Sequence, residues 1–161
     1  MIEQLFSLLK KMPEYTGALE SLRQGENIAI TGIGQINRSH ILAGLCRELG
    51  RPMVLLCQDD IAARRLQEEL ESFLEADVPI LPGRELTLYD AAVVSRSWEQ
   101  KRLRQLYDLA QGRIPIQIMS WESMSLRTMP PAILKEASFR LEIGKEYSMD
   151  DLTARLVAAG Y

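Results

Sequence analysis

The chain has 161 residues, 47% of them hydrophobic, so it is long enough to bury a core in one domain or in one domain plus part of another. Its 19 Lys and Arg against 22 Asp and Glu give a formal charge of -3, which argues against nucleic-acid binding driven by overall charge. Two cysteines without C-x-x-C spacing and a single histidine argue against a zinc site, and we expect no metal. The opening residues do not follow a signal-peptide pattern and no apolar run could span a bilayer, so we expect a cytoplasmic protein with no membrane partner.

Residues 1–24 are predicted to form a helical leader. Apolar residues recur at helical spacing as far as Met12, and Pro13 ends this first helix. A second short helix is predicted from Tyr15 to Arg23, ending near Gly25. We expect this leader to pack on the rest of the chain.

The next stretch has the pattern of a phosphate-binding loop. An apolar strand is predicted at Asn27–Thr31, and the chain then passes through glycines into a helix predicted at 36–49. Residues 32–39 align with the Walker A pattern G-x-x-x-x-G-K-[ST], in which glycines form a nest of N–H donors, the lysine neutralises phosphate charge and the hydroxyl holds Mg²⁺. Gly32 and Ser39 match the pattern, and Gly34 adds a second flexible position.

The two chemically demanding positions of this pattern are changed. Asn37 stands where the second glycine is expected, and Arg38 stands where the lysine is expected. The side chain of Asn37 would occupy the space that a phosphate needs, and the planar guanidinium of Arg38 fits poorly in the place of a lysine ammonium. We therefore interpret the loop as a degenerate nucleotide site, in effect a strand-to-helix turn, with no catalytic residue and no cofactor.

Two alternatives remain open at this loop. The chain is alternatively a divergent P-loop phosphotransferase or ATPase that uses Arg38 and Ser39. The loop also has two possible unliganded forms. In one, Gly32, Gly34 and the helix N-terminus still attract a lone anion such as sulfate. In the other, which we favour, Asn37 and Arg38 fill the space that a phosphate would need.

The residues that follow alternate between strand and helix patterns. Pro52–Cys57 is an apolar run typical of a strand buried on both faces of a parallel sheet. A helix is predicted from about residue 60 to 75, with Asp59 or Asp60 as its N-cap. Val78–Leu81 and Ile114–Met119 are predicted strands, separated by a loop at 84–97 and a helix at 97–111. This order predicts an α/β fold with a parallel sheet and the Gly32 loop at the carboxyl end of a strand.

Charged residues gather on the predicted helix at 60–75. Its inward positions are Leu66, Leu70, Phe73 and Leu74. Its outward positions are Arg64, Arg65, Glu68, Glu69 and Glu71. We interpret the charges as a solvated helix face rather than a binding surface.

The character of the sequence changes after Trp121. Pro130 and Pro131 form a break, after which a short helix and an alternating strand at 138–143 are predicted. A last helix follows, with Ser148 and Asp151 in a capping-box arrangement. One strand and one helix cannot build a core, so we expect the chain to end inside a second unit. The strand's free edge is expected to pair with a second molecule or to pack back on the first unit.

Three stretches together carry a resemblance to a known family. They are the altered loop at 32–39, the segment Glu85-Leu86-Thr87-Leu88-Tyr89-Asp90, and the segment Leu141-Glu142-Ile143-Gly144-Lys145-Glu146 with the ending Ala159-Gly160-Tyr161. In this order and spacing they resemble the N-terminal region of bacterial transcription-repair coupling factors, which is similar to the first two domains of the excision-repair protein UvrB. The second segment is similar to the family's E-x-L-P-Y-[DE] element, with Leu88 in the place of proline. Glu85, Tyr89 and Asp90 are its motif residues.

The resemblance implies a domain organisation and a set of partners. Residues 25–131 would form a degenerate RecA-like half-domain, and residues 138–161 would begin a small α+β domain that binds UvrA when complete. UvrA binding is therefore expected of the complete domain and doubtful for this chain. A longer protein of this kind would be an ATP-dependent DNA translocase that contacts DNA and RNA polymerase through other domains.

Three further candidates have an alternative reading as structural residues. Asp59 is a possible Walker B carboxylate, but its place before a helix favours N-capping. His40 could be a catalytic histidine, but no Ser or Cys with a paired acid lies at a spacing typical of a catalytic triad. We therefore favour a structural or exposed histidine. Near Trp98, a basic and aromatic surface is one interpretation, and an ordinary helix face is the one we favour. Its basic residues are Arg96, Arg102 and Arg104.

Overall fold

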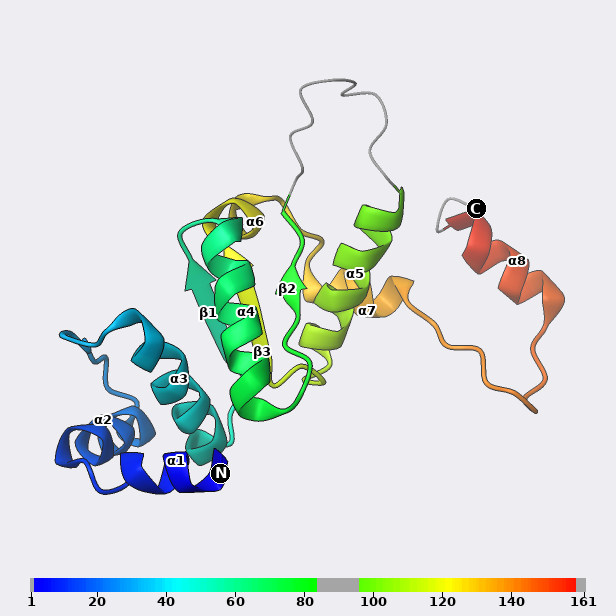
Figure 1. Cartoon of the computed structure of the whole chain (residues 1–161). Helices are drawn as coiled ribbons and strands as arrows, with labels where there is room; N and C mark the ends of the chain where they lie inside the picture. Colours follow the sequence, from blue (N-terminus) through cyan, green and yellow to red (C-terminus); the bar gives the residue numbers. More distant parts are fainter. Residues whose placement is uncertain (1, 84–95, 159–161) are drawn as a thin grey trace. The chain divides into compact units, whose positions relative to one another are not determined.

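The computed structural model describes residues 2–83 and 96–158 of the chain. The chain divides into two compact units, Met1–Leu126 and Arg127–Tyr161. The first unit contains the sheet and the loop of interest, and the second contains two helices (Figure 1).

Helices and strands alternate through most of the first unit. Its elements are α1 Ile2–Leu9, α2 Pro13–Gln24, α3 Gln35–Leu49, β1 Met53–Cys57, α4 Asp60–Leu74, β2 Ile80–Leu81, α5 Arg96–Ala110, β3 Ile116–Ser120 and α6 Trp121–Ser125. The predicted α/β class is therefore confirmed, and both helices of the predicted leader are present.

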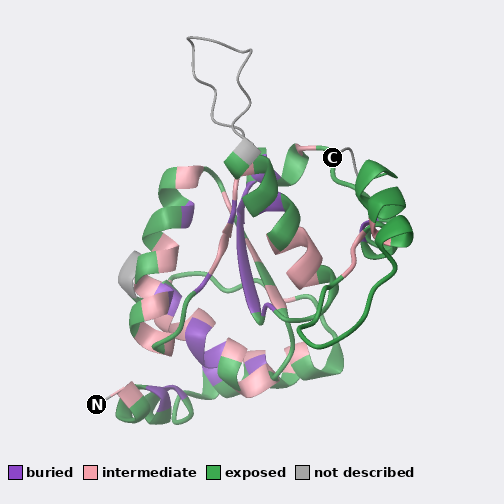
Figure 2. Cartoon of the chain, turned by 90° about the vertical axis from the view of Figure 1, so that its right-hand side faces the viewer, coloured by how far each residue is buried: buried purple, intermediate pink, exposed green. Residues whose placement is uncertain are grey.

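The sheet of the first unit is parallel, as the sequence predicts. Within the described residues it has three strands in the order β1-β3-β2. β1 and β3 align from Met53 opposite Ile116 to Cys57 opposite Ser120, and Ile80 of β2 lies opposite Ile118. The central strand β3 is buried along its whole length, and Figure 2 shows it enclosed between the flanking helices.

The strand predicted at Asn27–Thr31 is not formed. These residues are an irregular connection between α2 and α3. Ile28 and Ile30 instead line an apolar pocket of about 540 Å³ together with Tyr15, Ile41 and other residues of α1, α2 and α3. An alternating pattern predicts which side chains share a face, but a strand also requires a neighbour for its N–H and C=O groups.

The prediction that β1 is buried on both faces is wrong. Val54 is 55% exposed and Leu56 is 47% exposed, whereas Met53, Leu55 and Cys57 on the other face are half-buried. The half-buried residues Leu55 and Cys57 belong to the core to which α4 contributes. β1 lies at the end of the strand order, and its face with Val54 and Leu56 stays about half exposed.

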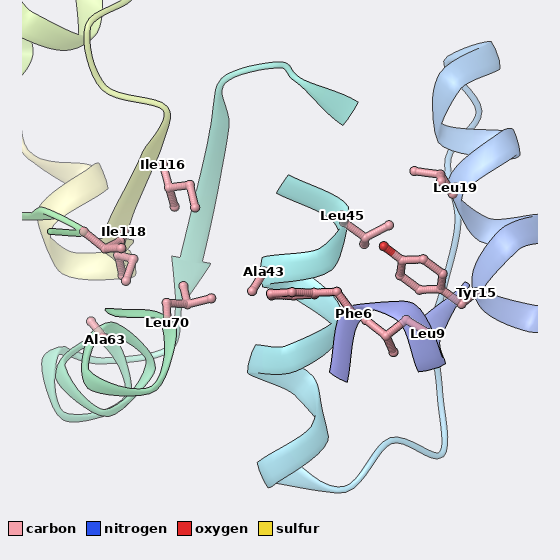
Figure 3. Packing of buried hydrophobic residues seen from close by; sticks show 11 residues of the cluster. Phe6, Leu9, Tyr15, Leu19, Ala43, Leu45, Ala63, Leu70, Ile116 and Ile118 are labelled. Carbon is pink, nitrogen blue, oxygen red and sulfur yellow. The ribbon is translucent and has the colours of Figure 1, made fainter. Parts of the chain in front are cut away.

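The leader packs on α3 through buried apolar side chains. Figure 3 shows Phe6, Leu9 and Tyr15 next to Leu45 and Ala43 of α3. All five side chains are buried and belong to one core cluster with residues of α4 and β3. This cluster therefore joins the leader and the sheet in one core.

Close contact at Gly44 shows how tightly the leader approaches α3. A Cβ atom at Gly44 would lie 2.7 Å from Leu9 Cδ1 and 2.8 Å from the Tyr15 hydroxyl. Two ion pairs flank this contact, since Arg47 lies 2.6 Å from Glu3 and Glu48 lies 2.6 Å from Lys10. The leader is thus an integral part of the first unit.

The ends of α3 and α4 follow the sequence signals. Gly50 ends α3 in the left-handed conformation, with φ of 58°, where glycine lacks the steric penalty of a Cβ. Asp59 begins α4 by accepting a hydrogen bond from the Ala62 N–H at 2.7 Å. The predicted N-cap role of Asp59 is therefore confirmed.

The second unit contains α7 Pro131–Ala137 and α8 Met149–Ala158. The strand predicted at 138–143 is not formed, and Leu141 and Ile143 are exposed. No strand lies within the described part of this unit to pair with it, so the alternating pattern has no partner. Ser148 accepts a hydrogen bond from the Asp151 N–H at 3.3 Å, as predicted for the start of α8.

The described helices are all too short or too polar to cross a lipid bilayer.

We expect Phe6→Ala to destabilise the first unit by about 3 kcal/mol, because a buried aromatic side chain is removed from a packed core. Phe6 is 6% exposed. Leu8→Ala is the matched control on the same helix, since Leu8 is 54% exposed and its loss should cost less than about 0.5 kcal/mol. Urea unfolding followed by circular dichroism measures both. Equal small effects would show that the leader does not contribute to stability.

Candidate functional site

The candidate loop is a short turn at the beginning of α3. Gly32 has a φ of 76°, and no atom lies within 4 Å of the position that a Cβ would take there. Gly34 is extended and precedes α3, whose first residue is Gln35. Of the eight positions in the phosphate-loop pattern, only those at 32–34 therefore lie outside the helix.

Asn37 belongs to the first turn of α3. Its N–H donates a hydrogen bond to the Gly34 carbonyl at 3.0 Å, so this amide is used within the helix start. The Asn37 side-chain nitrogen lies 3.9 Å from the position of a Cβ on Gly34. A nest for phosphate requires several N–H groups that converge on one point outside the helix. The early helix start leaves a shorter turn for such a nest than the pattern predicts.

Ser39 packs between two helices. Its side chain is fully buried, and its hydroxyl donates a hydrogen bond to the Glu69 carboxylate of α4. In the phosphate-loop pattern this hydroxyl would hold Mg²⁺. Here it links α3 to α4.

Glu69 corrects one prediction from the sequence. The sequence pattern places Glu69 and Glu71 on a solvated face, but both are half-buried. Glu69 accepts the Ser39 hydrogen bond, and Glu71 accepts one from the Val78 N–H at 3.1 Å. Helical periodicity assigns a face only approximately, and it does not show which neighbouring element packs beside that face.

Arg38 lies at the surface beside the turn. It lines a pocket of about 270 Å³ with Gly32, Ile33 and apolar residues of α3. Burial and the charge of Asp59 raise the pKa of the Cys57 thiol, and the positive charge of Arg38 acts in the opposite direction. The guanidinium therefore acts electrostatically on Cys57, the last residue of β1.

His40 lies in an aromatic stack. Its ring is stacked on Phe73 with a centroid distance of 5.1 Å and is tilted against Phe6 at 5.5 Å. Its Nε2 atom is buried and has no hydrogen-bond partner in the described structure. The imidazole thus contacts aromatic rings of α1 and α4, and neither ring is a nucleophile.

The basic surface around Trp98, which was the less favoured interpretation of the sequence, does not include Arg102. Arg102 is 5% exposed and donates hydrogen bonds to the Pro82 carbonyl at 2.7 Å and the Ser123 carbonyl at 2.9 Å. Its burial lowers its pKa. Trp98 donates to the Gly83 carbonyl. Arg104 is exposed, and the side chain of Arg96 lies outside the described residues.

Arg102 has a structural role that sequence reasoning missed. It joins the segments that follow β2 and β3, at the carboxyl edge of the sheet. The available signal was a charged residue inside the apolar period of α5, between Trp98 and Leu106, and it is weak because surface helices carry many arginines.

The remaining candidates do not form a site in the described structure. Glu85, Tyr89 and Asp90 lie outside the described residues, as does the ending 159–161. The described residues contain no cluster of His, Cys, Asp and Glu that could hold a metal ion.

Comparison with known proteins gives a consistent result. No protein-family model matches the chain. It is 29% identical to the transcription-repair-coupling factor of Myxococcus xanthus over 91% of its length. The corresponding proteins of Bacillus subtilis and Escherichia coli are 24% and 25% identical over 99% and 93% of the chain. The resemblance inferred from the sequence motifs is therefore confirmed. The chain spans 13–14% of the length of these curated relatives.

We expect Ser39→Ala to destabilise the first unit by about 1–2 kcal/mol, because the half-buried Glu69 carboxylate loses a hydrogen-bond donor. Ser72→Ala on α4 is the control, since Ser72 is exposed and donates a hydrogen bond to the Glu68 carbonyl of its own helix. A double-mutant cycle with Glu69→Ala, measured by urea unfolding, should show coupling of at least about 0.5 kcal/mol. Strict additivity would mean that the two side chains do not interact in solution.

Proposed function

We propose that this chain, which is similar to transcription-repair coupling factors along nearly its whole length, is a non-catalytic scaffold module of a transcription-coupled DNA repair factor. The observation that carries the proposal is this similarity over 91–99% of the chain. The first unit would be a degenerate RecA-like half-domain, at residues 25–131 with the leader at 1–24. Residues 138–161 would begin the UvrA-interaction domain.

The geometry of the loop supports the non-catalytic part of the proposal. α3 begins at Gln35, which leaves a turn of few residues for phosphate. The Ser39 hydroxyl is buried against Glu69, so Mg²⁺ binding would require this contact to break and a buried serine to turn outward. Arg38 supplies a positive charge beside the turn but not the compact ammonium of a phosphate-loop lysine.

The partners belong to the longer protein in this proposal. UvrA would bind the complete second domain, while DNA and RNA polymerase would bind other domains, including an ATP-dependent translocase. The exposed apolar side chains of the second unit support the view that it is completed by further sequence, since Leu141, Ile143, Met149 and Val157 are all exposed.

Calorimetry distinguishes the scaffold from the alternative, a divergent P-loop phosphotransferase or ATPase that uses Arg38 and Ser39. We expect no measurable heat when the chain is titrated with Mg·ATP, because the loop lacks a free nest and an exposed hydroxyl. Binding at micromolar Kd would overturn the non-catalytic proposal and favour the enzyme.

Variants of the loop test why it would not bind nucleotide. We expect Arg38→Lys alone to leave Mg·ATP binding undetectable, because Asn37 and the early start of α3 are unchanged. The double variant Asn37→Gly with Arg38→Lys removes both bulky side chains and is titrated in parallel. Measurable binding by Arg38→Lys alone would show that charge geometry, rather than space, limits the site.

UvrA binding tests the assignment of the second unit. We expect immobilised UvrA to retain a chain extended through the complete second domain and to retain this chain at least about tenfold more weakly, since most of the contact area would be missing. Thermal unfolding of both chains controls for folding. Failure of the extended, folded chain to bind would contradict the proposed partner.

A further inference from the structure

We draw no further inference here: the strongest candidate, the apolar pocket of about 540 Å³ that the leader, α3 and the connection at 28–33 line around Tyr15, Ile30 and Ile41, carries nothing, because nothing in the described structure shows what occupies it.

Discussion

The contact between α3 and α4 is the constraint on which the first unit depends. Ser39 of α3 donates to Glu69 of α4, and His40 stacks on Phe73 one turn further along α4. On its other side His40 meets Phe6 of the leader. One turn of α3 thus connects the leader to the helix that packs on the sheet. Ser39, whose hydroxyl would hold Mg²⁺ in a phosphate loop, is here part of this packing.

The sequence predicted the helices and the paired strands well because their signals are local. Asp59 as an N-cap and the left-handed Gly50 each act within one turn of chain, so a single sequence contains the necessary information. The parallel arrangement of β1, β2 and β3 followed from strands alternating with helices. The burial of β1 and of β3 could not be predicted in the same way. β3 is buried along its whole length and β1 is not, because burial depends on position in the sheet as well as on composition.

The predictions that were wrong concern residues whose partners lie far away in the chain. The stretches 27–31 and 138–143 both have strand patterns, yet neither has a neighbouring strand in the described structure, so both are irregular. In the candidate site, Gly32 and Ser39 could be matched to the phosphate-loop pattern from the sequence. The start of α3 at Gln35 could not be predicted from it. Glu69 and Arg102 were missed for the same reason, since each acts on a group 20 or more residues away.

The first unit has an open edge at β1, because β1 pairs with β3 on one side and with no other strand of the described residues. A parallel sheet is normally covered on both faces and extended by strands that are distant in sequence. In this unit α4 belongs to the core that half-buries Leu55 and Cys57, whereas Val54 and Leu56 remain exposed and their backbone groups face away from β3. The apolar composition of β1 is thus in excess of what its own unit buries. A further strand along this edge would satisfy the backbone groups of Val54 and Leu56, whereas burial of their side chains would need an element packed on that face of the sheet.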